Sequence, residues 1–502
     1  MANKKLTTNK GIPVPNDQAS ITTGKGSSYT LIQDTHLMEK LAHFTRERTP
    51  ERVVHAKGAG AHGYFEVTND LSKYSRAKFL SEVGKKTDMF VRFSTVGGEK
   101  GSADAKRDPR GFALKFYTEE GNYDLVGNNI PIFFIRDAIK FPDFVHTQKR
   151  DPTTNLADTT MFWDFLSLTP ESVHQATFLF TDRGTPLNYR HMDGFSSHTY
   201  MWYNEKNEYV WVKYHFKTVL GNATLTNDEA VKICGENPDH ATEDLFIAIE
   251  EEDYPQWDVF VQIMTPEEAL EYQFDPFDVT KVWYHGDYPL IPLGKMVLNR
   301  NPKNYFAEVE QAAFAPSNFV PGIGPSPDRL LQGRLFAYED AQRHRLGANH
   351  HQIPINRPKN AKATNYQRDG PMNVSDNGGS TPNYYPNSFN GSEPDSTVTP
   401  PTIDVDAHIN RHTREIEDVD FVQVGEFWRR VLSKTDKEHL VYNLKQHLGN
   451  AQERIQYRQT ALFYKAEPEY GTAVANALGL NTEKVKELSS LTPEERANAT
   501  KQ

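Results

Sequence analysis

Cysteine is almost absent from this chain of 502 residues, and several kinds of metal site are excluded with it. The single cysteine, Cys234, cannot build a disulfide framework, a Cys-ligated iron–sulfur cluster, a thiolate zinc site or a C-x-x-C-H attachment for haem. Any bound metal must therefore use nitrogen or oxygen ligands. Cys234 itself lies in a stretch with helical character, and we interpret it as a small buried side chain.

Positive charge is also in deficit, since 56 Lys and Arg stand against 67 Asp and Glu. This balance argues against nucleic acid as a partner, because neutralising phosphates needs a basic face. No apolar run approaches the roughly 20 residues of a membrane span, so no membrane partner is expected. The polar first 20 residues and the absence of a terminal Ser-Lys-Leu favour a cytoplasmic location and a bacterial source.

Aromatic residues are abundant, with 29 Phe, 23 Tyr and 6 Trp, and suit the walls of a buried pocket. Short runs of β character between about 52 and 300 predict antiparallel strands, including 88–96, 111–118, 123–127, 199–204 and 209–218. Helices are expected at 37–44, 157–168, 226–252 and 326–346, and from 427 onward. Many strands of this kind suggest a barrel.

Two motifs are interpreted as decoys. The string Gly58 to Gly63 fits G-x-G-x-x-G, but a dinucleotide site needs a helix to start there, and a strand pattern follows instead. The neighbours His350 and His351 do not point at one metal ion and have no carboxylate at ligand spacing, so a structural role is favoured.

The expected helix at 326–346 carries an unusual stripe. Steps of three and four place Leu331, Arg334, Tyr338, Ala341 and Arg345 on one face. A flat anionic partner would suit this face, and Arg334, one turn from Tyr338, favours a phenolate, which is a competent ligand for ferric iron. Taken alone, the Arg-x-x-x-Tyr pair is a weak signal, and a half-buried surface tyrosine is the favoured interpretation.

Three further segments supply polar groups. Arg52-Val-Val-His55 is expected to be a short strand that places His55 on one face and Arg52 with Val54 on the other. Arg92 and Ser94 share a face of the next strand, where serine can fix the tautomer of an imidazole and arginine can clamp a carboxylate. Asn128 lies in a loop, where its amide could hold a small polar ligand.

Several separated strings resemble the monofunctional haem catalases, in order from about residue 25 to about residue 475. They include the segments 44–60, 91–96, 107–112, 124–129, 334–338, 365–371 and 382–387. The resemblance implies an α+β catalase fold, with an eight-stranded antiparallel β-barrel, an N-terminal arm, a wrapping segment and a C-terminal helical portion. The corresponding boundaries are 1–50 for the arm, 51–300 for the barrel, 301–420 for the wrapping segment with the proximal helix, and 421–502 for the helical domain.

The same resemblance implies a homotetramer that binds haem b and disproportionates hydrogen peroxide to water and dioxygen through a ferryl intermediate, protecting the cell from peroxide. It assigns Tyr338 as the iron ligand supported by Arg334, and His55, Asn128 and Ser94 as the catalytic residues. The haem contacts it implies are Arg52, Val54, Arg92, Phe133, Phe141, Arg334 and Arg345, with Asp108 and Val96 in the channel.

A second cofactor, NADPH, is implied by similarity to the small-subunit catalases. The matching positions are His174, Thr181, Arg183, Lys217, Trp283 and His285. Arg183 and Lys217 suit the extra phosphate, whereas Asp193 adds negative charge where the family has a neutral residue and should weaken affinity.

Two alternatives stay open at this point. A haem peroxidase could use the same fold to oxidise organic reductants, although it would need a wider distal side or would lack the wrapping and helical parts. A non-enzymatic nucleotide or haem sensor is motivated only by the glycine string and the basic strand face at 209–218. Oxygen evolution from added peroxide distinguishes all three.

Overall fold

The computed structural model describes residues 4–26, 28–405, 407–412 and 418–502. By its contacts the chain forms two units, Met1–Glu51 and Arg52–Gln502. The first unit contains helix α1 (Thr35–Phe44), which begins where the Asp34 carboxylate accepts the Leu37 N–H. Among its described residues only Asp34 is buried, so this unit has no core of its own.

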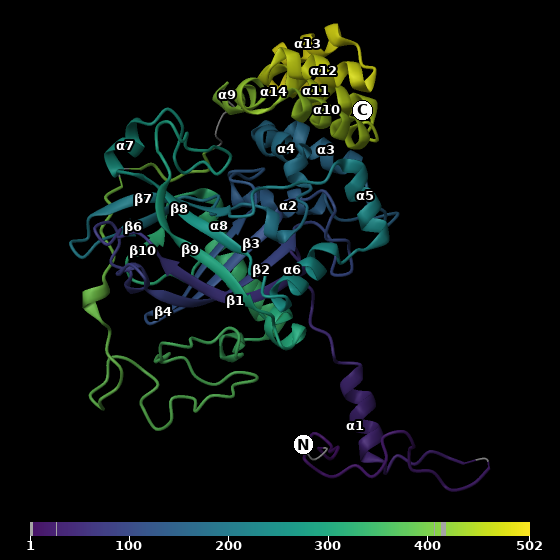
Figure 1. The fold of residues 1–502 in the computed structure, drawn as a ribbon, viewed down its shortest axis with the longest axis vertical. Coiled ribbons are helices and arrows are strands. Elements are labelled where there is room, and N and C mark those ends of the chain that lie inside the picture. Colours follow the sequence, from purple (N-terminus) through teal and green to yellow (C-terminus); the bar gives the residue numbers. More distant parts are fainter. Residues whose placement is uncertain (1–3, 27, 406, 413–417) are drawn as a thin grey trace. The chain divides into compact units, whose positions relative to one another are not determined.

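The second unit is built around a closed antiparallel barrel, as predicted (Figure 1). Eight strands follow one another around the ring in the order β7-β5-β4-β3-β2-β1-β9-β8, and β8 pairs with β7 to close it. Their bounds are β1 Gly58–Val67, β2 Lys86–Thr95, β3 Arg110–Thr118, β4 Gly121–Asn128, β5 Gly194–Phe195, β7 Tyr209–Thr218, β8 Gln256–Met264 and β9 Ile291–Arg300. Strands β6 (Tyr200–Tyr203) and β10 (Ile323–Pro325) extend the sheet beyond β7.

Alternation along the strands separates the barrel core from the face that carries polar groups. On β2, Met89, Val91 and Phe93 belong to the aromatic core inside the barrel. Arg92 and Ser94 point the other way, towards a cavity between the barrel and a long helix, α8 (Arg329–Leu346). The strand predicted after the glycine string is confirmed, and β1 extends back to include the string at 58–63 itself.

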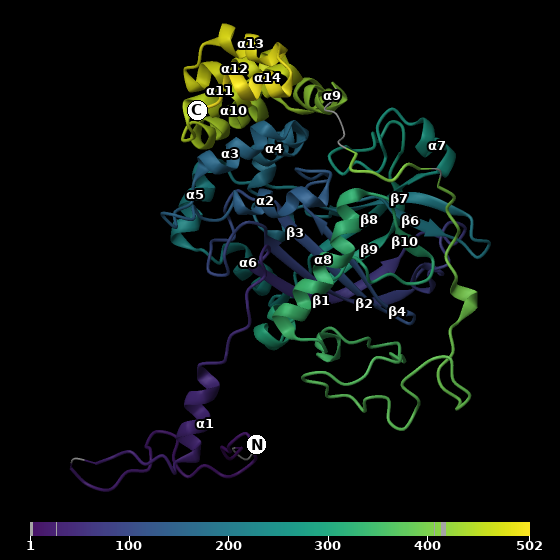
Figure 2. The same ribbon diagram turned by 180° about the vertical axis from the view of Figure 1, so that it is seen from behind.

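The remaining helices cover the barrel and form a separate layer at one end of it, as Figure 2 shows from behind. Those that follow strands are α2 Phe141–His146, α3 Thr159–Leu168, α4 Val173–Phe180, α5 Asn227–Glu236, α6 His240–Glu250 and α7 Pro266–Glu271. The C-terminal helices are α9 Val419–Glu426, α10 Lys434–Leu448, α11 Glu453–Ala466, α12 Pro468–Leu478, α13 Thr482–Ser490 and α14 Pro493–Ala499. Helices α9 to α12 share one apolar core with α3 and α4, and α13 packs with α11 and α12 in a second, smaller cluster.

Local capping explains several helix ends. Ser433 and Asp436 form the expected capping box of α10, and Gly449 follows the last residue of that helix. The start of α8 differs from the prediction, because its cap is Asp328, which accepts the Leu330 and Leu331 N–H groups, rather than Ser326. Within the described part of 357–405 the only helical element is a short turn at Ser396–Val398. In the described chain no helix is both long and apolar enough to cross a membrane.

Candidate active site

A cavity lies between α8 and the outer face of β2, β3 and β4. The space that no atom fills is about 800 Å³, part of it open to solvent. Apolar side chains make up most of its wall, and charged or polar groups gather at a few points. The lining residues are Arg52, Val53, Val54, His55, Arg92, Ser94, Gly111, Ala113, Val126, Gly127, Phe141, Phe314, Ala337, Tyr338, Ala341, Gln342 and Arg345.

Tyr338 lies on the α8 side of the cavity, with Arg334 bound to it one helical turn away. A spacing of four residues stacks them on one face of the helix, and Arg334 Nη2 donates to the Tyr338 hydroxyl oxygen at 2.8 Å. The same nitrogen donates to the Val126 carbonyl at 3.0 Å, which anchors the guanidinium to β4. Burial lowers the pKa of Arg334, but the neighbouring Tyr338 outweighs it, and the net shift is upward. The pair can therefore hold a negative oxygen against the cavity.

Two residues behind this pair were missed by the sequence analysis. The Asp328 carboxylate that caps α8 also contacts His198 Nδ1 at 2.6 Å, and both side chains are buried. Burial is the main reason why the pKa of His198 is lowered. The Ser-Pro-Asp start of the helix was the available signal for Asp328, whereas nothing local marks His198.

His55 lies on the barrel side of the cavity. Its Nδ1 is 2.9 Å from the Ser94 hydroxyl oxygen. Burial and the charges of Arg92, Arg334 and Arg52 hold the pKa of His55 at about 3. The imidazole is therefore neutral at ordinary pH, and Nε2 is the nitrogen that Ser94 leaves available.

The predicted strand at 52–55 is wrong. His55 has a φ of 63°, in the left-handed region that breaks a strand. The arginine Arg92 holds this turn by donating to the carbonyls of His55 at 2.7 Å and Ala56 at 3.0 Å. Tertiary contacts therefore override the β preference of the two valines.

Gly111 leaves the room that His55 and Ser94 need. A Cβ at this position would lie 2.3 Å from Ser94 Oγ and 2.7 Å from His55 Nδ1. Asn128 pairs with Gly111 across the β3–β4 ladder and is half-buried, but it is not part of the cavity wall.

The residues predicted to contact the haem through apolar side chains lie at the cavity, and the two residues predicted for the channel contact each other. Phe141 and the half-buried Val54 line the cavity, and Phe133 packs behind Phe141 with its ring centroid 6.4 Å away. Asp108 accepts the N–H groups of Val96 at 2.6 Å and of Gly97 at 2.7 Å, and burial raises the pKa of its carboxyl group. Val96 is itself buried.

Three arginines, of which Arg92 and Arg345 are buried and Arg52 is half-buried, meet at one end of the cavity. Arg52, Arg92 and Arg345 come from the turn before β1, from β2 and from α8, and the buried carboxylate beside them is Glu310. Burial lowers the pKa of each arginine, and mutual repulsion adds to this effect at Arg52 and Arg345. Within the described residues, Arg52 Nη1 and Arg92 Nε are buried without a hydrogen-bond partner. The donor set therefore suits a ligand with more than one anionic group.

The residues predicted for NADPH lie on two surfaces. His174 and the Thr181–Arg183 turn belong to α4 and its end, where the rings of Phe178 and Phe427 stack 4.2 Å apart beside His174. The Thr181 hydroxyl donates to the Phe178 carbonyl, and Arg183 is exposed.

The second surface is the β7 face predicted from alternation. His285 is exposed and lies 5.5 Å from His215, centroid to centroid. Lys217 Nζ is paired with Asp193 at 2.9 Å, and Trp283 is buried. Asp193 therefore already neutralises the cation that was expected to bind a phosphate.

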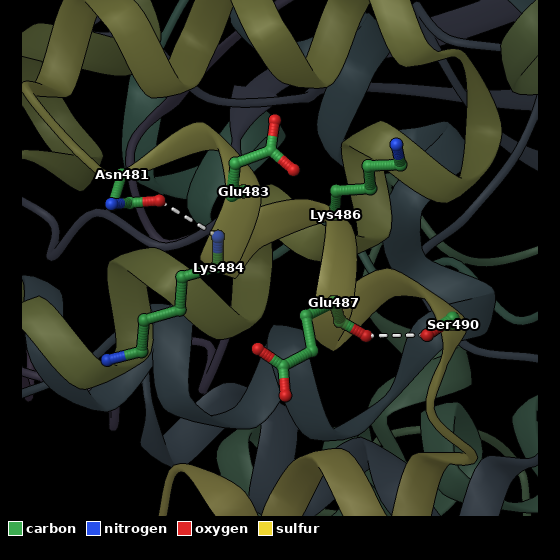
Figure 3. Close-up of a pocket in the computed structure, with 6 residues that line it drawn as sticks. All are labelled: Asn481, Glu483, Lys484, Lys486, Glu487 and Ser490. Atoms are coloured by element: carbon green, nitrogen blue, oxygen red, sulfur yellow. Dashed lines mark hydrogen bonds between the residues drawn. The ribbon is translucent and has the colours of Figure 1, made fainter.

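A hollow on the C-terminal helix α13 is of a different kind (Figure 3). Only exposed residues surround it, chiefly Glu483, Lys484, Lys486 and Glu487. Its hydrogen bonds are local to the helix, from the Lys484 N–H to Asn481 and from Ser490 to the Glu487 carbonyl. It contains nothing that suggests chemistry.

Comparison with known proteins identifies the family. The family model described as catalase matches residues 7–391, and a model described as catalase-related immune-responsive matches residues 415–478. A catalase of Methanosarcina barkeri is 62% identical over 99% of both chains. A peroxisomal catalase of Toxoplasma gondii is 56% identical over 95% of both chains.

Solved structures agree with the sequence relatives. Catalase A from Saccharomyces cerevisiae has a TM-score of 0.92 at 46% identity, covering 94% of this chain and 99% of that one. The structure of a bacterial catalase has a TM-score of 0.88 at 45% identity, covering 95% of this chain and 96% of that one. The match spans the barrel with its cavity as well as the C-terminal helices, and this chain belongs to the catalase family.

Proposed function

We propose that the catalase reaction of this chain takes place in the cavity beside α8, with haem b held between Tyr338 and His55. One observation carries the assignment: an arginine-bound phenol and a neutral histidine line the same apolar cavity from opposite elements. Tyrosine ligation is the arrangement known for haem in catalases. Tyr338 would be the iron ligand, kept as a phenolate by the Arg334 guanidinium.

The shape and charge of the cavity fit this group. Haem b is a flat apolar ring with two carboxylates, and the cavity joins apolar walls to a cluster of three arginines. Arg52 Nη1 and Arg92 Nε offer unused donors to those carboxylates, as Arg345 offers its charge. Val54 and Phe141 would cover the ring.

Haem, when bound, supplies the redox chemistry of the reaction, in which one peroxide is reduced to water and a second is oxidised to dioxygen. His55 moves the protons. Neutral Nε2 accepts a proton from one peroxide oxygen and returns it to the other, so that water can leave. Ser94 fixes the ring by bonding Nδ1, which leaves Nε2 free for this task.

Access and orientation are assigned to the surrounding residues. We assign to Asn128 the role of orienting the peroxide by donating from its amide. Phe133 and Phe141 narrow the approach to the cavity, and Asp108 with Val96 forms a polar point on the channel, where a small polar substrate is favoured over bulky reductants. This narrow approach supports peroxide disproportionation over the peroxidase alternative.

Paired substitutions test the two sides of the site. His55→Ala should retain the haem absorption band and lose oxygen evolution by about 10²-fold to 10⁴-fold, the usual contribution of a general base. Tyr338→Phe should instead lose haem, because a phenyl ring has no anionic ligand. Haem content is measured by absorption, and oxygen by electrode. Full haem and normal turnover in Tyr338→Phe would refute the ligand assignment, and undiminished turnover in His55→Ala would refute the base.

We further propose that the chain is of the NADPH-binding type, with the dinucleotide at His174, Thr181, Arg183, Lys217, Trp283 and His285. The support is that half-buried Lys217 and exposed His285 lie beside the buried imidazole of His215, so that one cation, paired with Asp193, and two aromatic rings meet at this face. NADPH bound there would be a reserve of electrons that protects the enzyme.

The Lys217–Asp193 ion pair makes this site testable. Asp193→Asn frees Lys217 and removes a repulsive charge, so NADPH should bind severalfold more tightly, with a smaller change for NADH. Arg183→Ala should weaken NADPH alone. Fluorescence titration with both dinucleotides measures these affinities. Equal affinities for NADPH and NADH that neither substitution changes would remove the site and leave the catalase assignment intact.

We also propose an assembly, a location and a subdivision for this chain. Exposed apolar side chains in the arm, including Leu6, Ile32 and Phe44, favour burial in other copies, which supports a homotetramer. The segments 1–50, 51–300, 301–420 and 421–502 are its proposed divisions. A cytoplasmic location and a bacterial source stay predictions, and cell fractionation tests the first.

A further inference from the structure

Glu310 is a buried carboxylate that the proposed reaction does not use. It ends an unusual π-helical turn, Phe306–Glu310, and only 2% of its surface is exposed. Such turns are rare and are found often at functional sites. The position therefore calls for a physical reason, because an ionised carboxylate is costly to bury without compensation.

The compensation comes from the arginine cluster. Glu310 Oε1 lies 3.4 Å from Arg345 Nη2 and 3.9 Å from Arg52 Nη1, and Oε2 lies 3.5 Å from Lys100 Nζ. The same turn also binds the arginines through its backbone, since the Glu310 carbonyl accepts from Arg52 at 3.0 Å and from Arg345 at 2.9 Å. One residue thus fixes two of the three arginines.

The distances show that the Glu310 carboxylate attracts the arginine side chains but forms few close hydrogen bonds with them. Glu310 Oε2 is buried with no hydrogen-bond partner among the described residues, and its contacts with Arg52 and Lys100 are long for charge-assisted bonds. Opposite charges at these distances still interact strongly in a buried setting. Glu310 offsets part of the arginine repulsion while leaving Arg52 Nη1 and Arg92 Nε available.

We propose that Glu310 is a resident counter-ion, a positioning residue that holds the arginine cluster together until two haem carboxylates take over, and that it then opposes their binding by repulsion. This inference rests on the proposed placement of those carboxylates at Arg52, Arg92 and Arg345. The inference predicts that the negative charge of Glu310 stabilises the haem-free protein and weakens haem binding in the haem-bound protein. Removing the charge costs stability most when haem is absent, because haem brings its own anions to the same arginines.

The test measures how fast haem leaves the intact holoenzyme for an excess of apomyoglobin. Glu310→Gln should slow haem transfer by on the order of tenfold, since it removes a negative charge close to both carboxylates. Glu310→Asp keeps the charge and should stay closer to the wild-type rate. Glu308→Gln is the matched control: it lies two residues earlier in the same turn, bonds His62 instead of the arginines, and should leave the rate unchanged.

A purely structural role would give the opposite sign, because damage to the cluster speeds haem loss. Faster or unchanged transfer in Glu310→Gln would therefore overturn the inference. Arg345→Gln distinguishes a failure of the counter-ion inference from a failure of the proposed haem site. This variant should speed haem transfer, and an unchanged rate of transfer in it would refute the haem site itself.

A second measurement tests the inference if Glu310→Gln folds poorly. Soluble yield of Glu310→Gln should rise more than that of wild type when expressing cells are fed excess haem, because haem supplies the missing anions. An equal gain in both proteins would contradict the resident counter-ion.

Discussion

At the scale of single residues, the neutral state of His55 determines how the enzyme responds to pH. Burial and three arginine charges keep the pKa of this imidazole at about 3. We expect kcat/KM for peroxide to be flat between about pH 5 and about pH 8, because the base does not titrate in this range. Initial rates in a series of buffers of equal ionic strength measure this. A titration near pH 6 that disappears when His55 is replaced would contradict it.

Gly111 gives a second prediction about the same histidine. In Gly111→Ala the new methyl would occupy the space of Ser94 Oγ and His55 Nδ1, so the imidazole must move. We expect turnover to fall by about tenfold or more, with the haem spectrum little changed. Gly101→Ala, where nothing lies within 4 Å, is the control and should be neutral. Normal turnover in Gly111→Ala would show that the tight contact is unimportant.

The sequence located Tyr338 and Ser94, which line the cavity, and Arg334, which binds Tyr338, because each lies at a regular spacing on one helix or one strand. It could not locate Glu310 or His198. The arginine partners of Glu310 are 258 and 35 residues away in the chain and the partner of His198 is 130 residues away, and neither residue has a local signal for its ion pair. Such contacts exist only after the barrel has closed.

At the scale of elements, one hydrogen bond ties α10 to α3. Trp163 Nε1 donates to His447 Nδ1 at 2.8 Å, and burial lowers the pKa of His447 to about 4, so the acceptor stays neutral. His447→Leu leaves the buried indole N–H without a partner and should reduce the free energy of unfolding by about 1–3 kcal/mol. Urea unfolding followed by fluorescence measures this.

His439→Leu is the control on the same helix, because it removes a partly exposed contact with Asp182 that should contribute about 1 kcal/mol or less. A loss in His447→Leu no larger than in this control would show that the buried bond is unimportant.

Elements with strong local signals were predicted well, and those set by distant contacts were not. The strand at 88–96, the hairpin of β3 and β4 and the capping box of α10 agree with the structure. The segment 52–55 does not, because Arg92 bends it from another strand. Strand β5 has two residues, too few to give a period-two signal.

At the scale of the whole molecule, buried neutral histidines link stability to pH. Burial lowers the pKa of His55 and His215 to about 3 and of His174 and His447 to about 4. The unfolded chain binds protons at these sites below about pH 6.5, and the folded chain does not. Their contribution is therefore complete above that pH and is lost as pH falls towards 4 and 3.

We expect the urea midpoint to fall between about pH 7 and about pH 4.5, with a smaller fall in His447→Leu, which has one such group fewer. Asp108 and Asp124 act in the opposite sense, because burial raises the pKa of each carboxyl group. A midpoint that is constant over this range, or that rises, would show that the histidines do not govern acid stability.

The number of strands in the closed barrel could not be predicted from the strand patterns of the sequence. Closure depends on β8 pairing with β7, while β6, the hairpin partner of β7, lies outside the ring. Resemblance to catalases supplied the number of strands, and the topology confirms it. Periodicity alone supports only an antiparallel barrel.

The central claim is that this chain disproportionates hydrogen peroxide at one site, and the ratio of oxygen released to peroxide consumed tests it most directly. The haem-loaded protein is given peroxide without any organic reductant, with oxygen followed by electrode and peroxide by its ultraviolet absorption. We predict one dioxygen for every two peroxides consumed, and loss of this activity in His55→Ala while its haem is retained. Peroxide consumption that requires an added organic donor and releases no oxygen would contradict the account.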